Sequence, residues 1–216
     1  MTNVIRFVNS RFTSNSYIIY STESEEVWIV DPGDFYPMYD WMNANDKTNV
    51  KGVLITHVHF DHIYGVNDLY SKFPSTIFYV YNEEGINALY DTKKNGSKYA
   101  ESPIVLDSKA CVKKIVTLDL ELWNGCFIRC FFTPGHSEDS MCMLLGKILF
   151  TGDTLIKNYK TVTKLKGGSV DNLRKSIDWI ASLKGNNIIV YGGHENSFAL
   201  DIYDLSIATA NNLTNK

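Results

Sequence analysis

Hydrophobic residues along the first half of the chain alternate between short β-like runs and stripes with helical spacing. Runs rich in β-branched and aromatic residues are typical of strands, and apolar residues three or four positions apart are typical of helices. Phe35, Met38 and Met42 share such a stripe, as do Ile63, Val66, Leu69, Tyr70 and Phe73. The predicted strands are 4–8, 17–20, 27–30, 49–55 and 77–80, and the predicted helices are 35–42, 63–73 and 83–90.

The second half repeats this arrangement after a polar segment, 91–103, which we predict to be a surface loop. The predicted strands are 112–116, 127–132, 141–145, 147–150 and 187–191, and the predicted helices are 170–183 and 200–212. Ser169 is expected to cap the first of these helices, with Val170, Leu173, Ile177 and Ala181 facing inward. Two similar halves of this kind favour an α+β fold in which two sheets pack face to face, with helices outside.

Composition and charge restrict the class of protein. The 216 residues are 44% hydrophobic and 21% charged, and we expect one domain over 1–216. A net charge of -3 argues against a general nucleic-acid binder. Residues 1–6 lack the apolar core of a signal peptide and no run reaches transmembrane length, so we expect a cytoplasmic protein without membrane contact. The four cysteines form no Cys-x-x-Cys pair, and we expect them to be buried free thiols.

Candidate chemistry is concentrated in the segment 56–62, Thr-His-Val-His-Phe-Asp-His, which follows the apolar run Val53-Leu54-Ile55. Alternate residues of an extended segment point to the same side, so His57 and His59 share a face. Asp61 and His62 follow in the turn that opens the next helix. Imidazole and carboxylate groups this close together suit zinc, and also iron or manganese.

The remaining two histidines and one further aspartate lie in similar contexts. His136, Asp153 and His194 each follow an apolar β-like run and a glycine, where a strand ends. A surface cluster of histidines is the alternative to a metal site. The recurrence of the same context in three further places favours the metal site.

These motifs resemble those of the metallo-β-lactamase-fold hydrolases. The resemblance runs from Asp31-Pro32-Gly33 through the His-x-His-x-Asp-His motif at 57–62, and it continues to Pro-Gly-His at 134–136, Gly-Asp-Thr at 152–154 and Gly-His-Glu at 193–195. Within this family the chain is most similar to short, single-domain members of the glyoxalase II-like branch. The resemblance implies a four-layer αββα sandwich.

The resemblance also implies two divalent metal ions, with zinc preferred and iron or manganese as alternatives. One ion would be bound by His57, His59 and His136, the other by Asp61, His62 and His194, and Asp153 would bridge them. A hydroxide between the ions would attack a small thioester, ester or lactone. Asp61 would also accept a proton from the water, and Asp31 would support the ligands.

Departures from the family pattern restrict the reaction further. An aspartate at 153 and the missing signal peptide disfavour a secreted β-lactamase, and His59 in place of glutamate disfavours the diiron redox members. The chain is too short for the glutathione-binding helical domain of full-length glyoxalase II, and residues 156–160 lack that enzyme's usual glycine and cysteine, which weakens the case for a glutathione thioester.

Several assignments remain open from sequence alone. The four lysines in 155–168 are either a solvated loop or an anion site. The acidic pair Glu138-Asp139 would either repel an anionic substrate or select a cationic one, in conflict with an anion site at the lysines. Phe12 either touches substrate or packs in its loop. A mononuclear iron persulfide dioxygenase using His57, His136 and Asp153 is the alternative enzyme. A non-catalytic binding protein on the same fold is the third possibility, and the oligomeric state is not predicted.

Overall fold

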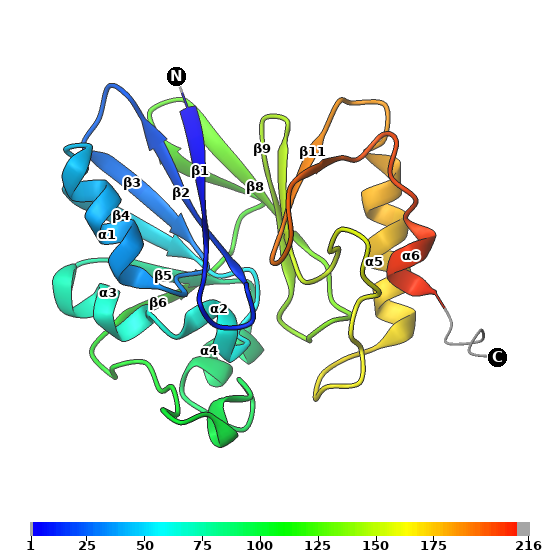
Figure 1. Cartoon of the computed structure of the whole chain (residues 1–216), viewed down its shortest axis with the longest axis horizontal. Coiled ribbons are helices and arrows are strands. Elements are labelled where there is room, and N and C mark those ends of the chain that lie inside the picture. The colour runs from blue at the N-terminus through cyan, green and yellow to red at the C-terminus, as the bar shows by residue number, and fades with distance from the viewer. Residues whose placement is uncertain (1, 211–216) are drawn as a thin grey trace.

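The computed structural model describes residues 2–210, and two six-stranded sheets form its centre (Figure 1). The first sheet has the order β1-β2-β3-β4-β5-β6. Strands β1 to β3 pair antiparallel, whereas β3 to β6 pair parallel. The strands are β1 (Thr2–Val8), β2 (Asn15–Ser21), β3 (Glu26–Val30), β4 (Asn49–Leu54), β5 (Ile77–Val80) and β6 (Cys111–Lys114).

The second sheet has the order β12-β11-β10-β9-β8-β7. Its strands pair antiparallel except for β10 and β11, which pair parallel. As a result β8, β10 and β11 all run in the same direction. The strands are β7 (Asp119–Trp123), β8 (Cys126–Phe132), β9 (Met141–Leu145), β10 (Ile148–Gly152), β11 (Ile189–Gly192) and β12 (Phe198–Ala199).

Helices cover the outer face of each sheet, so that the molecule has four layers, as expected from the sequence (Figure 1). Helices α1 (Phe35–Ala44) and α3 (Val66–Lys72) pack on the first sheet, and α5 (Val170–Ser182) and α6 (Ser206–Thr209) pack on the second. The shorter helices α2 (Phe60–Ile63), α4 (Glu83–Leu89) and the 3₁₀ helix η1 (Ser97–Tyr99) lie near one end of the first sheet. The αββα sandwich is confirmed.

Three clusters of buried side chains separate these layers. Residues such as Tyr17, Leu54 and Phe150 fill the space between the two sheets. The predicted stripe Phe35, Met38 and Met42 is at most 1% exposed beneath α1. Burying apolar surface of this kind is the main stabilising contribution to folding.

The stripe predicted for α5 is correct in its centre and wrong at its ends. Leu173 and Ile177 are buried, and Ser169 caps the helix by accepting a hydrogen bond from Asn172 N at 3.3 Å. Val170 is 44% exposed and Ala181 is also exposed. Ile180 is buried instead, because the helix turns its last apolar position toward the second sheet.

The helix predicted over 63–73 is divided into α2 and α3 at Gly65. A Cβ on Gly65 would lie 2.1 Å from the backbone oxygen of Gly33, and the N–H of Gly65 donates a hydrogen bond to Pro32 O at 2.9 Å. The backbone of one segment therefore lies directly against that of the other, and only glycine permits this approach. This contact sets the direction in which α2 presents its side chains.

The helix predicted over 200–212 is much shorter in the structure, where α6 covers only Ser206–Thr209. The Asp201 carboxylate accepts hydrogen bonds from Gly185 N and Asn187 N, and the Tyr203 hydroxyl accepts one from Asn158 N at 2.6 Å. These contacts hold 201–203 in a non-helical conformation. Residues 211 and 212 lie outside the described part of the chain.

The segment 91–103 is anchored more firmly than a solvated surface loop would be. Asn95 and Ser97 are fully buried, and Asn95 Nδ2 donates to the backbone oxygens of Ala88 and Ile104 at 3.0 and 2.9 Å. The backbone oxygen of Asn95 also accepts a hydrogen bond from Phe60 N at 2.9 Å. The segment is therefore tied to α2, directly beside the histidine-rich motif.

The state of the cysteines agrees in part with the prediction of buried free thiols. All four cysteines are free; Cys130 and Cys142 are buried and Cys126 is half-buried, but Cys111 is exposed, so its predicted burial is wrong. Within residues 2–210, no helix has the length and apolar character required to cross a bilayer.

Candidate metal centre

Four of the seven predicted ligands follow the end of β4 in the first sheet. The strand ends at Leu54, and the extended segment after it carries His57 and His59. Asp61 and His62 then lie in α2. The change from extended backbone to helix within a few residues turns all four side chains toward the same region.

The other three ligands come from the second sheet. His136 follows β8, Asp153 follows β10 and His194 follows β11. These strands run in the same direction, so their carboxyl ends reach the same edge of the sheet. His136 and His194, which are 58 positions apart in sequence, meet there.

The structure brings six of the seven predicted residues together in two groups, and a third group of potential ligand atoms joins Asp31 to His57 and His62. The potential ligand atoms of His57, His59 and His136 lie within 4.8 Å of one another, and those of Asp61, His62 and His194 do the same. His59 Nδ1 and His136 Nε2 are 2.8 Å apart. Nitrogen and oxygen atoms converge in this way where a cation is bound.

Asp153 links the two groups. Its Oδ2 lies 3.7 Å from His136 Nε2 and 3.5 Å from His194 Nε2. Its Oδ1 lies 3.4 Å from His62 Nε2. One carboxylate therefore contacts imidazoles of both groups, which is the position required of a bridging ligand.

In the described part of the chain, three donor atoms at this site lack hydrogen-bond partners, whose place a bound cation would take. His57 Nε2, His62 Nε2 and Asp153 Oδ1 are buried and have no hydrogen-bond partner among the described residues. Buried polar atoms nearly always have a partner, so three orphans at one point are unusual. Because the set contains imidazole and carboxylate but no thiolate, it suits zinc, iron or manganese.

The two groups differ in the proton affinity of their histidines. Burial, followed by the neighbouring imidazoles, lowers the pKa of His57 well below its ordinary value, and burial lowers the pKa of His59 to about 3. Burial alone would also lower the pKa of His62, but the carboxylates of Asp61 and Asp153 outweigh it and raise that pKa well above the ordinary value.

The carboxylates of Asp61 and Asp153 and the neighbouring histidines shift one another's pKa values. Contacts with Asp153 and Asp61 outweigh burial and raise the pKa of His194 to about 9. Burial would raise the pKa of both aspartates, yet the neighbouring imidazoles, His62 first, lower the pKa of each. In the metal-free chain His57 and His59 are therefore neutral, whereas the second group is an ion-paired cluster.

Asp31 supports the site from the end of β3. Its carboxylate accepts hydrogen bonds from Thr56 N at 2.7 Å and Thr56 Oγ1 at 2.6 Å, and it lies 3.2 Å from His62 Nδ1. Thr56 Oγ1 in turn lies 3.1 Å from His57 Nδ1. Such contacts orient imidazole ligands, in agreement with the role that the resemblance implied for Asp31.

The acidic pair is divided: exposed Glu138 and buried Asp139 both line the small pocket beside His59, but the carboxylate of Asp139 is engaged within the protein. Asp139 is 6% exposed, and its Oδ2 accepts a hydrogen bond from Val58 N at 2.8 Å. Val58 lies between His57 and His59, so a carboxylate of the second sheet fixes the backbone of the histidine motif in the first. The sequence gives no signal for this contact because it joins residues 81 positions apart.

Two glycines allow the backbone to approach the ligands closely. A Cβ on Gly193 would lie 2.2 Å from Asp153 Oδ1 and 2.7 Å from His62 Cε1. A Cβ on Gly152 would lie 2.4 Å from Thr56 Oγ1, and this glycine has a φ of 47°. Side chains at these positions would therefore occupy the space of the ligands or of their support.

Comparisons with known proteins agree with the fold. The model of the "Metallo-beta-lactamase superfamily" matches residues 10–194. A hydroxyacylglutathione hydrolase of Pseudoalteromonas translucida (strain TAC 125) is 28% identical over 199 residues, which are 91% of this chain and 66% of that protein. The chain thus spans slightly less than two thirds of this relative's length.

Solved structures show the same fold. The B3 metallo-beta-lactamase BLEG-1 matches with a TM-score of 0.82 and 28% identity, over 92% of this chain and 94% of that one. TTHA1623, solved in a di-iron-bound form, matches with a TM-score of 0.74 and 20% identity, over 91% of this chain and 94% of that one.

Proposed function

The chain belongs to the metallo-beta-lactamase superfamily, and on that premise we propose that it is a dinuclear metal-dependent hydrolase of glyoxalase II type. Its substrate would be a small thioester, ester or lactone. The observation that carries the proposal is the position of Asp153, whose two oxygens lie within 3.7 Å of imidazoles from both ligand groups. A site for a single ion has no need of this arrangement.

We assign His57, His59 and His136 to one ion, and Asp61, His62 and His194 to the other, with Asp153 shared. Zinc is the preferred ion, because borderline-soft imidazole ligands without thiolate or redox groups suit it. Iron and manganese are the alternatives, and TTHA1623 binds two iron ions in its solved form. With Asp153 shared, each ion would have four protein ligands, and catalysis would require a water molecule bound in addition to these.

Bound divalent ions would supply an acidic water as nucleophile and positive charge for the developing oxyanion. The chain's own residues would position the reactants around them. Asp61 Oδ2 lies 3.4 Å from His194 Nε2 and 3.7 Å from His62 Nε2, at the mouth of the ligand cluster. Because it is only partly buried and its low pKa keeps it ionised, it would accept the proton of an attacking water.

The thioester class follows from the relative's name, hydroxyacylglutathione hydrolase. This chain spans only 66% of that protein. The relative's name therefore supports acyl-thioester hydrolysis by this chain more strongly than it supports glutathione as the thiol of the substrate. We therefore place thioester hydrolysis first and leave the thiol open.

A second candidate is a mononuclear iron persulfide dioxygenase. His57, His136 and Asp153 would form a two-histidine, one-carboxylate triad of the kind used by non-haem iron oxygenases. The rings of His57 and His136 are 4.8 Å apart, and Asp153 Oδ2 lies 3.7 Å from His136 Nε2. The three residues are thus adjacent, although this candidate leaves the second group without a role.

The test compares the wild type with Asp61→Ala after loading with zinc or with iron. The hydrolase proposal predicts that the zinc-loaded wild type releases thiol from acyl thioesters, that chelation abolishes this and added zinc restores it, and that Asp61→Ala loses both activity and one metal equivalent. Iron-dependent oxygen uptake with a persulfide, unchanged in Asp61→Ala with one iron retained, would instead establish the second candidate.

A further inference from the structure

A cavity of about 570 Å³ opens directly beside the ligand cluster. His59, Asp61, His136, Asp153 and His194 form its inner wall. Its outer wall comes from four segments that are distant in sequence, and it consists of Phe12, Phe60, Lys93, Lys94, Asn95, Gly96, Val162, Leu165 and Lys166. A volume of this size holds a small substrate.

One part of the outer wall is apolar. Phe12 and Phe60 pack edge to face with their ring centroids 5.5 Å apart. Phe12 is 69% exposed, and Val162 and Leu165 are 51% and 52% exposed. Large apolar side chains held open to solvent around a metal cluster favour contact with an apolar portion of substrate, which supports the substrate role that the sequence left open for Phe12.

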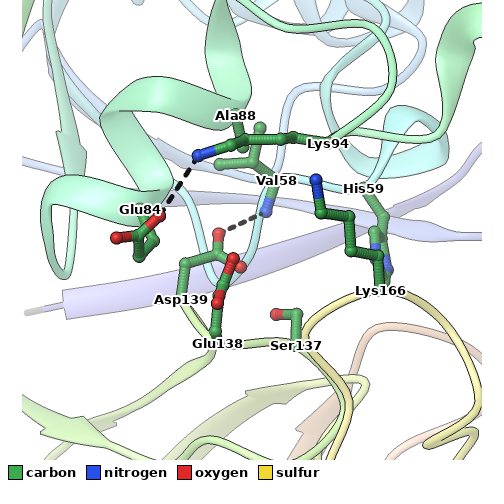
Figure 2. A pocket seen from close by; sticks show the side chains of 9 residues that line it. All are labelled: Val58, His59, Glu84, Ala88, Lys94, Ser137, Glu138, Asp139 and Lys166. Carbon is green, nitrogen blue, oxygen red and sulfur yellow. Dashed lines mark hydrogen bonds and ion pairs between the residues drawn. The ribbon is translucent and has the colours of Figure 1, made fainter.

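The other part of the outer wall is cationic. Lys93 and Lys94 come from the segment between α4 and η1, and Lys166 comes from the segment between β10 and α5. Figure 2 shows the side chains of Lys94 and Lys166 extending into the smaller pocket that adjoins the cavity beside His59. The two lysine-bearing segments therefore meet at the entrance to the site.

The nearby acids leave two of these lysines available. Lys94 Nζ pairs with Glu84 Oε2 at 3.2 Å, and Asp139 is directed to Val58 N (Figure 2). Within the described residues, neither Lys93 nor Lys166 has an ion-pair partner within 4.0 Å. Asp91 and exposed Glu138 are the opposing charges nearby. Asp91 Oδ1 accepts the backbone N–H of Lys93 at 2.8 Å, and Glu138 lines the smaller pocket together with Lys94 and Lys166.

The segment that carries Lys93 is held in place before any ligand binds. Buried Asn95 fastens it to Ala88 and Ile104, and Asn95 O accepts the N–H of Phe60 in the metal motif. A preorganised cation loses less freedom on binding than one on a solvated loop. The cavity's own carboxylates, Asp61 and Asp153, face the imidazoles, so the outer wall is left with positive charge.

We propose that this cavity selects an acyl ester or thioester that carries a carboxylate, with Lys93 and Lys166 pairing with the carboxylate and the Phe12 side of the wall contacting the apolar chain. The inference rests on the proposed hydrolase function. It adds a substrate class, and it assigns specificity to a segment, 91–103, that has no ligand residues.

The experiment uses two thioesters of the same neutral thiol, one with a succinyl group and one with a butyryl group. A second pair places the carboxylate on the thiol side, so that the two possible locations of the anion are distinguished. The zinc-loaded wild type, Lys93→Gln/Lys166→Gln and Lys175→Gln are compared. Lys175 is exposed on α5 and does not line the cavity, so it is a matched control for loss of one positive charge.

We expect the wild type to prefer one carboxylated substrate, with kcat/KM roughly tenfold higher than for its neutral partner, since two partly exposed ion pairs contribute about this much. The double variant should lose this preference through KM, with a larger loss on the carboxylated than on the neutral substrate, and should show a weaker salt dependence. Equal rates for charged and neutral substrates in the wild type, or an equal loss on both in the double variant, would overturn the proposal.

A binding measurement separates this proposal from the proposed function. Thermal unfolding of the same proteins is recorded with the thioether analogue of the carboxylated substrate, which cannot be hydrolysed. A rise in Tm for the wild type and Lys175→Gln, absent in the double variant, supports the cationic pocket even if no thioester is cleaved. No rise in the wild type at millimolar analogue contradicts it, whatever the hydrolytic activity.

Discussion

Replacing Gly193 by alanine tests whether Asp153 and His62 must occupy their observed positions. The new Cβ would lie 2.2 Å from Asp153 Oδ1 and 2.7 Å from His62 Cε1, whereas ordinary van der Waals contact begins at 3.4 Å. Relief of the first contact requires a shift of about 1.2 Å, the difference between 3.4 and 2.2 Å. The φ of Gly193 is not positive, so alanine would adopt its backbone conformation without strain.

The expected loss follows from this shift. Misplacing a reacting group by about 1 Å costs roughly a hundredfold in rate, and Asp153 contacts both ligand groups. We therefore expect Gly193→Ala to reduce kcat for thioester hydrolysis by about a hundredfold and to reduce the metal content per chain. Thiol release measures the first quantity, and elemental analysis of protein dialysed against metal-free buffer measures the second.

The matched control is Gly125→Ala in the β7–β8 turn, where a Cβ would meet nothing within 4 Å. Its φ of 76° makes alanine costly by about 1 kcal/mol in stability, without any contact to the site. Activity and metal content should therefore equal those of the wild type. Gly193→Ala with wild-type activity and two bound ions would refute the account of how Asp153 is held.

Three further predictions concern the support of the site and its protons. Asp31→Ala should destabilise the metal-free protein by about 3 kcal/mol in urea unfolding, because it leaves the buried N–H and hydroxyl of Thr56 without an acceptor. Asp31→Asn should lose less stability, and equal stabilities of the two variants would contradict this. Asp139→Ala should lower the free energy of unfolding by about 1–3 kcal/mol, because the buried N–H of Val58 loses its acceptor. Asp139→Asn keeps an acceptor and should lower it less. A wild-type Tm for Asp139→Ala would contradict the contact. Zinc binding at pH 7 should release about two protons, because the raised pKa of His62 and that of His194, about 9, keep both imidazoles protonated in the metal-free chain. The affinity for zinc should therefore increase as pH rises toward 9. Calorimetry in buffers of different ionisation enthalpy measures the proton release, and zinc uptake without it would contradict the prediction.

The sequence predicted most of the fold because local patterns determine it. The stripe Phe35, Met38 and Met42 is buried as expected, and β9 and β10 overlap the strands predicted over 141–145 and 147–150. The sequence did not predict the break at Gly65 or the short α6. Both depend on contacts with distant backbone, such as Gly33 O against Gly65, that no local pattern encodes.

The candidate site shows the same division. The proximity of the seven predicted ligands could be anticipated because each follows a strand and a characteristic motif, and parallel strand directions place such positions together. The contact of Asp139 was not predicted because its carboxylate could only be matched with Val58 N once the two sheets were packed. Lys93 was likewise placed on a solvated loop, since the burial of Asn95 that fixes this segment depends on α4 and Ile104.

The central claim is that Asp153 joins two metal positions in one catalytic centre. The most direct test is the number of divalent ions bound per chain, measured by elemental analysis on protein purified without a metal-binding tag and equilibrated with zinc. The account predicts two ions per chain in the wild type and fewer than two in Asp61→Ala. One ion per chain at saturation, unchanged in Asp61→Ala, would contradict it.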